Sequence, residues 1–154
     1  CRLIIDAAGE RLLEALKLEP DFVKPNIFEL AEAVGYPASA DPEVVIHSAR
    51  KLLDMGARAV CVSMSQEGAL FVSKDEPEAL YVNSNPKIDD CGAVGTGDAM
   101  VGAIANSMYT GLSFCELAKY TVATGRACAR LAGTEMATLK RVYEVYETLQ
   151  VYTV

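Results

Sequence analysis

The stretch Ala59-Val60-Cys61-Val62-Ser63 decides the fold class of this sequence. It is a continuous apolar run, which predicts a strand in a sheet that is covered on both faces. On its amino-terminal side, Asp41-Pro42 predicts the start of a helix that runs to Gly56, with the aspartate as cap and the proline in the first turn. On the other side, residues 69–72 and 79–82 are strand-like runs around a charged turn, which predicts an antiparallel hairpin.

The same alternation continues outward to both ends of the chain. Residues 3–5 predict a strand and residues 10–18 a helix; residues 21–24 predict a second strand, which Pro25 closes, and residues 27–34 a second helix. Three helical patterns complete the chain, over residues 98–109, 113–131 and 137–149. Strands that alternate with helices and then give way to a hairpin predict an α/β layered fold with a largely parallel sheet and an antiparallel edge.

Size and charge exclude several classes of function. The 154 residues suit one domain over residues 1–154, and the net charge of −7 argues against nucleic acid or a membrane surface as a partner. The sequence contains no apolar run of the roughly 18 residues that span a bilayer and no secretory signal, so we expect a cytoplasmic protein. Because Arg2 to Asp6 already has the pattern of a strand and Cys1 replaces an initiator Met, we expect a fragment of a longer chain.

The cysteines predict neither a zinc site nor a disulfide framework. The sequence has five cysteines, at positions 1, 61, 91, 115 and 128, with no Cys-x-x-Cys pair and a single histidine, His47. An odd count and wide spacing are typical of reduced thiols.

The densest chemical signal is Gly92-Ala93-Val94-Gly95-Thr96-Gly97-Asp98, a glycine-rich loop that runs into an apolar helix. Such a loop can direct several N–H groups to one point, where the helix start adds a partial positive charge of about half a unit. The Walker loop is excluded because it needs Gly-Lys-Ser/Thr, and a dinucleotide fingerprint is excluded because residues 88–91 make a poor strand. The loop therefore predicts an anion site of another kind.

Asp98 stands at the mouth of this predicted anion site. A carboxylate there repels a simple phosphate ligand, but it is suited to accept a proton from an attacking alcohol while the N–H groups stabilise a transferring phosphoryl group. That combination predicts a kinase. An ordinary helix cap remains the alternative for Asp98, and the two roles are compatible.

Gly95-Thr96-Gly97-Asp98, followed by residues 99–102, resembles the second signature of the ribokinase-like (PfkB-type) carbohydrate kinases. The usual form in that family is Gly-Ala-Gly-Asp, so Thr96 is a departure. The resemblance implies that Asp98 is the catalytic base and that Gly95, Thr96 and Gly97 hold the transferring phosphoryl group. It also implies nucleotide contacts at Val94 and Gly97.

Lys24-Pro25-Asn26-Ile27-Phe28-Glu29-Leu30 resembles a second element of the family, Lys-Pro-Asn-x-x-Glu-Leu. The resemblance implies that Asn26 and Glu29 organise the water shell of Mg²⁺ and that Lys24 approaches the nucleotide phosphates. From the residues alone, Asn26 and Glu29 could equally form a capping box, and Lys24 could be a solvated charge.

Two weaker resemblances concern the nucleotide. Ser63-Met64-Ser65-Gln66-Glu67-Gly68-Ala69-Leu70 resembles the family's Ser/Thr-Leu-Gly-x-x-Gly-Ala-Leu turn, which implies ATP contacts from Ser63, Ser65 and Gly68. If residue 65 must be left-handed, serine in place of glycine costs about 1 kcal/mol. Residues 121–135 resemble the segment that closes the adenine pocket, which implies contacts from Thr124 and Cys128. Together with Gly92, this segment favours the phosphofructokinase-like branch, which includes 1-phosphofructokinase and tagatose-6-phosphate kinase.

The resemblance implies a three-layer ribokinase-like fold with helices on both faces of the sheet, of which this chain is the carboxy-terminal, ATP-binding part. The amino-terminal half, which supplies the lid and most sugar contacts in the family, cannot be located here. The expected activity is ATP-dependent phosphoryl transfer to a sugar phosphate of the fructose-1-phosphate or tagatose-6-phosphate type. A non-catalytic nucleotide-binding half-domain is the alternative, whereas a nicotinamide-binding domain fails for want of a preceding strand. An unpaired strand edge would also allow a homo-oligomer.

Overall fold

The computed structural model of the chain describes residues 1–84, 95–131 and 135–154. Backbone contacts divide the chain into two compact units. Unit 1 comprises Cys1–Ser65, Ala69–Tyr81 and Thr153–Val154, and unit 2 comprises Gln66–Gly68 and Val82–Tyr152. The strands form a sheet in which they follow one another in chain order, from β1 to β6.

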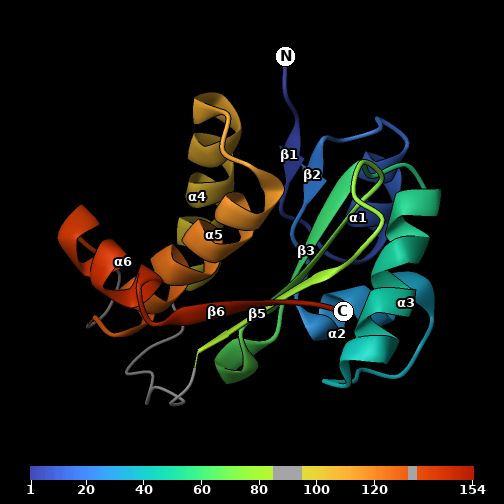
Figure 1. The fold of residues 1–154 in the computed structure, drawn as a ribbon. Helices are drawn as coiled ribbons and strands as arrows, with labels where there is room; N and C mark the ends of the chain where they lie inside the picture. The colour runs from blue at the N-terminus through green and yellow to red at the C-terminus, as the bar shows by residue number, and fades with distance from the viewer. Residues whose placement is uncertain (85–94, 132–134) are drawn as a thin grey trace. The chain divides into compact units, whose positions relative to one another are not determined.

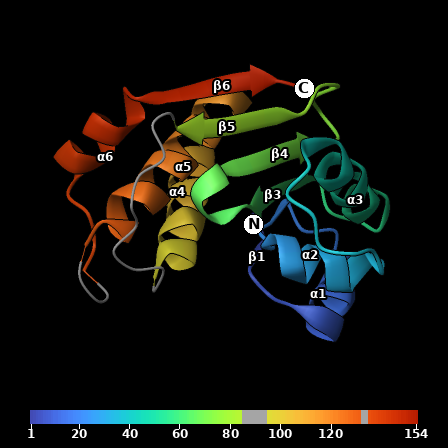
Figure 2. The same cartoon turned by 90° about the horizontal axis from the view of Figure 1, so that it is seen from below.

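Unit 1 contains the alternating strands and helices of the first half of the chain (Figure 1). Its elements are β1 (Ile4–Ile5), α1 (Gly9–Leu16), β2 (Phe22–Val23), α2 (Ile27–Val34), α3 (Pro42–Asp54), β3 (Ala59–Ser63) and β4 (Ala69–Ser73). The pairs β1 with β2 and β2 with β3 are parallel. The pair β3 with β4 is antiparallel (Figure 2). The predicted α/β fold with a largely parallel sheet and an antiparallel edge is confirmed.

The core of unit 1 lies between the sheet and helices α1 to α3, which cover the same face of β1 to β3 (Figure 1). Its buried members include Leu12, Leu16, Leu30, Leu52, Val23, Val60, Val62 and Leu70. Cys61 and its register partner Phe71, on the opposite face of the strands, are also fully buried. This confirms the prediction that the run over residues 59–63 is a strand covered on both faces.

The helix boundaries of unit 1 follow local signals in the sequence. Asn26 caps α2, and Gly35, with φ 71°, ends it in the left-handed conformation that glycine adopts without strain. Asp41 caps α3, with Pro42 in the first turn as predicted. The first predicted helix ends earlier than expected, at Leu16, and the side chain of Leu18 is exposed.

Unit 2 is mainly helical. It contains most of a short 3₁₀ turn (Ser65–Glu67) and of β5 (Leu80–Ser84), followed by α4 (Thr96–Thr110), α5 (Phe114–Ala129), α6 (Leu139–Tyr146) and most of β6 (Leu149–Thr153). Helix α4 packs along α5, and α5 packs along α6. None of the described helices is long and apolar enough to cross a membrane.

The prediction of a final helix over residues 137–149 is wrong at its carboxy-terminal end. The helix α6 stops at Tyr146, and β6 starts at Leu149. Apolar and exposed residues alternate from Leu149 to Tyr152, which is the spacing of a strand. The segment is held by pairing, because Val154 exchanges two backbone hydrogen bonds with Ala79, of 3.0 and 3.2 Å.

Candidate active site

The predicted phosphate and metal residues of unit 1 lie at the carboxyl ends of its parallel strands. Lys24 follows β2 directly, and Ser63 is the last residue of β3. The N–H of Ser63 donates to the carbonyl oxygen of Pro25 at 3.0 Å, and Asn26 forms a parallel bridge with Ser63. The structure thus brings the two motifs together at the edge where open α/β sheets bind ligands.

Lys24 is buried with an anionic partner that the sequence motifs did not single out. The residue is 5% exposed, and its Nζ lies 3.2 Å from Oδ2 of Asp6, the residue that follows β1. The signal that could have identified Asp6 is its position, since it follows its strand as Lys24 follows β2. Burial raises the pKa of the neighbouring Cys61 thiol to about 12, and the charge of Lys24 opposes that increase.

Asn26 and Glu29 form a complete capping box at the start of α2. Oδ1 of Asn26 accepts hydrogen bonds from the N–H groups of Phe28 and Glu29, both at 2.9 Å, and Oε2 of Glu29 accepts one from the N–H of Asn26, also at 2.9 Å. The other carboxylate oxygen of Glu29 accepts no hydrogen bond from the described residues. The same part of the chain contains no cluster of three His, Cys, Asp or Glu side chains that could hold a metal directly. The arrangement fits a cation that keeps its water shell, as Mg²⁺ usually does.

The predicted anion loop leads into the start of α4 in unit 2. Gly95 is the N-cap residue with φ 80°, and no side chain among the described residues caps this helix. The first four N–H groups of a helix have no acceptor within it, and here they belong to Gly95, Thr96, Gly97 and Asp98. Asp98 lies in the first turn and is exposed. Val94 lies outside the described residues.

Close packing against α5 fixes the first turn of α4. A Cβ atom on Gly125 of α5 would lie 2.7 Å from Cγ of Met100 and 3.3 Å from Cγ2 of Thr96, so the helices approach at a glycine. Oγ1 of Thr96 is buried and has no hydrogen-bond partner among the described residues. A buried hydroxyl group without a partner is costly, and a bound ligand atom would remove that cost.

The turn between β3 and β4 requires two unusual backbone conformations. Ser65 has φ 53°, so the condition under which serine costs about 1 kcal/mol is met. Gly68 has φ 103°, and a Cβ atom there would lie 2.0 Å from the carbonyl oxygen of Val82. Glycine is therefore obligatory at position 68, as expected for a turn in which the backbone itself makes the contact.

Arg126 of α5 is a further residue that the sequence motifs did not single out. It is 5% exposed, and its Nη2 donates to the carbonyl oxygen of Gln66 at 2.7 Å, which ties the turn to the helix within unit 2. In the sequence, the signal that could have identified Arg126 is its position between two small residues, Gly125 and Ala127, within a helical pattern.

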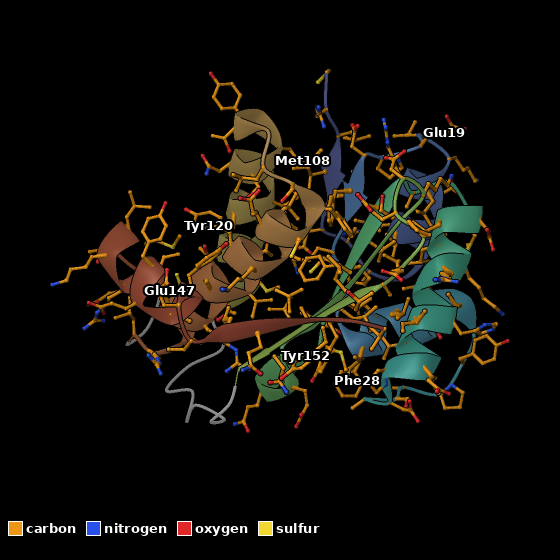
Figure 3. The ribbon with its side chains drawn as sticks, in the orientation of Figure 1. Glu19, Phe28, Met108, Tyr120, Glu147 and Tyr152 are labelled. Atoms are coloured by element: carbon orange, nitrogen blue, oxygen red, sulfur yellow. The ribbon has the colours of Figure 1, made fainter. Side chains whose placement is uncertain are left out.

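The two residues predicted at the adenine pocket also belong to α5. Oγ1 of Thr124 donates to the carbonyl oxygen of Tyr120 at 2.9 Å, and Sγ of Cys128 accepts from the N–H of Ala137 at 3.4 Å. Tyr120 is labelled in Figure 3. Cys128 thus holds the segment before α6 against α5. The four described cysteines are free thiols, and Cys91 lies outside the described residues.

Each unit therefore gathers its own group of predicted residues. Unit 1 brings together Lys24, Asn26, Glu29 and Ser63, and Ser65 follows two residues after β3. Unit 2 contains Gly68, the start of α4 from Gly95 to Asp98, and Thr124 and Cys128 on α5.

Comparison with known proteins assigns the chain to a family. The model of the pfkB family carbohydrate kinases matches residues 1–140. The chain is 34% identical over 128 residues to 1-phosphofructokinase of Bacillus subtilis, which covers 83% of this chain and 41% of that protein. It is 32% identical over 150 residues to ATP-dependent 6-phosphofructokinase isozyme 2 of Escherichia coli, which covers 96% of this chain and 47% of that protein.

Solved structures agree with the sequence comparison. The crystal structure of phosphofructokinase-2 from Escherichia coli in complex with potassium superposes with a TM-score of 0.86 at 31% identity, over 95% of this chain and 47% of that one. The chain therefore spans less than half the length of these relatives. The resemblance seen in the motifs is confirmed, and the chain belongs to the pfkB family of carbohydrate kinases.

Proposed function

We propose that the protein transfers the γ-phosphoryl group of ATP to a hydroxyl group of a phosphorylated ketose, of the fructose-1-phosphate or tagatose-6-phosphate type. The start of α4 carries this proposal, because an exposed carboxylate, Asp98, adjoins N–H groups that no described side chain caps. The relatives support the substrate class, since they include 1-phosphofructokinase of Bacillus subtilis and D-tagatose-1-phosphate kinase of Bacillus licheniformis.

In this mechanism Asp98 accepts the proton of the attacking hydroxyl group. The N–H groups of Gly95, Thr96 and Gly97, at the positive end of the helix dipole, hold the transferring phosphoryl group and offset the charge that develops on its oxygens. The buried Oγ1 of Thr96 supplies a further donor. Packing at Gly125 keeps this set of donors in place before the substrate arrives.

The other predicted residues bind the nucleotide in this proposal. Lys24 approaches the phosphates, and the turn with Ser63, Ser65 and Gly68 lines the phosphates and ribose. Val94, Thr124 and Cys128 contribute further contacts with the nucleotide.

Mg²⁺ would neutralise phosphate charge, and Asn26 and Glu29 would hold it through its water shell. The free carboxylate oxygen of Glu29 fits this role, because the capping box uses the other one.

The substitution Asp98→Asn tests the proposal. The amide has nearly the same size, so the loop should keep its shape, while the loss of the base should lower kcat about 10²- to 10⁴-fold. Affinity for ATP should stay the same or increase, because a negative charge beside the phosphates is removed. Glu147→Gln, an exposed carboxylate beyond α6 (Figure 3), is the matched control and should leave kcat unchanged. A nearly normal kcat in the Asp98→Asn variant would remove Asp98 from the mechanism.

A nucleotide-binding module without turnover is the second candidate for these 154 residues by themselves. It is favoured by the span of the chain, which is less than half that of its relatives. Titration with MgATP and an assay with ketose phosphates separate the two, since the module would bind the nucleotide and transfer nothing.

The proposal implies a cytoplasmic enzyme whose partners are ATP and a sugar phosphate. The proposal also includes self-association of the protein. It is supported by the structure of Escherichia coli phosphofructokinase-2 in a tetrameric inhibited form.

A further inference from the structure

Asp6 and Lys24 form an ion pair in which the cation is buried. From this pair we infer that Asp6 is a positioning residue, which holds the ammonium group of Lys24 at the carboxyl edge of the sheet, ready for the nucleotide phosphates. The inference rests on the proposed function, in which Lys24 approaches those phosphates. It assigns to Asp6 a role that acts through Lys24, without contact between Asp6 and the substrate.

The sheet itself fixes the backbone of both residues. Ile5 and Val23 are register partners in the parallel pair of β1 and β2, so the next residues along, Asp6 and Lys24, emerge side by side. The N–H of Lys24 donates to the carbonyl oxygen of Ile5 at 3.1 Å, immediately before Asp6. The strand pairing therefore fixes the backbones of Asp6 and Lys24 relative to each other.

A lysine side chain in this position needs an anion to fix its end. Its four-carbon stem is flexible and its ammonium group is strongly hydrated, so burial to 5% exposure is costly unless a charge compensates. Asp6 supplies that charge at 3.2 Å, while its own side chain stays 34% exposed. Two of the three ammonium donors remain for another acceptor, such as a phosphate oxygen.

The other groups near Lys24 do not supply a compensating charge. Cys61 lies close enough to interact with Lys24, but its thiol is fully buried and stays protonated at neutral pH. Asp21 belongs to the opposite end of the same strand pair, where its Oδ2 accepts a hydrogen bond from the N–H of Leu3 at 2.8 Å. Among the described residues, Asp6 is the one carboxylate within ion-pair distance of Lys24.

A double-mutant cycle tests whether Asp6 acts through Lys24. The variants are Asp6→Asn, Lys24→Met and the combination, and calorimetry measures the affinity of each for MgATP and for adenosine. We expect Lys24→Met to weaken MgATP binding about 10- to 100-fold and Asp6→Asn to weaken it in the same direction. In the Lys24→Met background, Asp6→Asn should have no further effect. Adenosine, which lacks phosphates, should bind all variants equally, whereas a merely structural role would weaken both ligands.

Two further variants make the cycle decisive. Asp21→Asn removes the same charge from the same strand pair and should leave MgATP affinity unchanged. Asp6→Glu retains the carboxylate and should recover most of the affinity that Asp6→Asn loses. If Asp6→Asn weakens MgATP binding equally with and without Lys24, the inference is overturned. If Asp6→Asn alone fails to fold, Asp6→Glu and the combined variant, which buries no unpaired charge, still decide it.

A measurement without nucleotide separates this inference from the proposed function. The rate at which an amine-specific reagent labels Lys24, read by mass spectrometry, should increase in the Asp6→Asn variant and stay slow in the Asp21→Asn variant. Absence of MgATP binding in the unsubstituted chain would refute the nucleotide site alone. An unchanged labelling rate in the Asp6→Asn variant would refute the positioning role alone.

Discussion

The α-carbon of Gly68 faces the carbonyl oxygen of Val82 so closely that a Cβ atom would stand 2.0 Å from it. Gly68 also has φ 103°, which a residue with a Cβ atom rarely adopts. Gly68→Ala should therefore lower the free energy of unfolding by about 2 kcal/mol or more, because the added Cβ atom clashes with backbone. Gly102→Ala is the control, since that glycine lies exposed within α4 with open space around it. It should increase stability by up to about 1 kcal/mol. Urea unfolding measures both, and equal effects would contradict the prediction.

The left-handed backbone of Ser65 destabilises the folded chain, and glycine at this position should remove that strain. Ser65→Gly should increase the free energy of unfolding by about 1 kcal/mol. Glu19 is a matched case, because it has φ 51° in the turn after α1 (Figure 3), so Glu19→Gly should stabilise the chain similarly. Thermal denaturation checks both variants. If neither gained stability, the two backbone conformations would carry no strain.

Glu29→Gln separates helix capping from metal binding. Glutamine can still accept the hydrogen bond from the N–H of Asn26, so α2 should keep its capping box and the unfolding free energy should change by less than about 1 kcal/mol. The lost charge should weaken binding of MgATP in a calorimetric titration. Glu116→Gln is the control, because Ser113 and Glu116 form the same capping box at the start of α5. Equal MgATP affinities in both variants would leave Glu29 with a capping role alone.

The buried thiol of Cys61 predicts a dependence of stability on pH. Burial raises its pKa from an ordinary value of 9.0 to about 12, so the folded chain binds the proton more tightly than the unfolded chain does. The contribution to stability is complete below pH 9 and is lost as the pH rises toward 12. Unfolding experiments across that range should show a steeper decrease for the native sequence than for Cys61→Ala. Parallel curves would show that the thiol does not titrate on unfolding.

Thiol reagents give a second view of the same burial. At mildly alkaline pH, the exposed Cys1 and Cys115 should react quickly and Cys61 should react only after unfolding. Mass spectrometry of digested chain identifies the labelled residues. Rapid labelling of Cys61 in the folded chain would contradict its burial.

Strand β1 at the edge of the sheet predicts self-association. It is two residues long, Ile4–Ile5, and both side chains are half-buried. Among the described residues, no strand pairs with the outer side of β1, so its backbone can pair with another chain, and a lysine there would oppose that pairing. Sedimentation should therefore show associated chain, with Ile4→Lys shifted toward the monomer. A strictly monomeric unsubstituted chain would contradict the prediction.

Much of the fold could be predicted because its signals are local. Helix α2 has the predicted bounds, since Asn26 starts it and Gly35 stops it, and β3 follows directly from its apolar run. Strand β6 could not be predicted with the same method, because its conformation depends on pairing with a distant part of the chain, as the bonds between Val154 and Ala79 show. The apolar residues at the end of the chain fit either the helical period of about 3.6 or the strand period of about 2 until the pairing partner is known.

The candidate site divides in the same way. Motifs with fixed spacing, such as the start of α4 around Asp98, stand out in the sequence. Asp6 and Arg126 gain their importance from neighbours that are distant in sequence, Lys24 at 18 residues and Gln66 at 60 residues, and the local signals around them do not identify those partners. What such pairs show in a sequence is a charged residue at a position where the surrounding pattern predicts burial.

Asn26 and Glu29 are held in place by folding as well as by chemistry. Because both side chains start α2, natural selection for a folded chain alone would preserve the Asn-x-x-Glu motif. A descendant gene that had abandoned phosphoryl transfer would keep this motif for as long as its product had to fold. The exposed carboxylate of Asp98 caps no helix through its side chain and has no such protection. When a member of the family loses phosphoryl transfer, residue 98 should therefore change before residues 26 and 29 do.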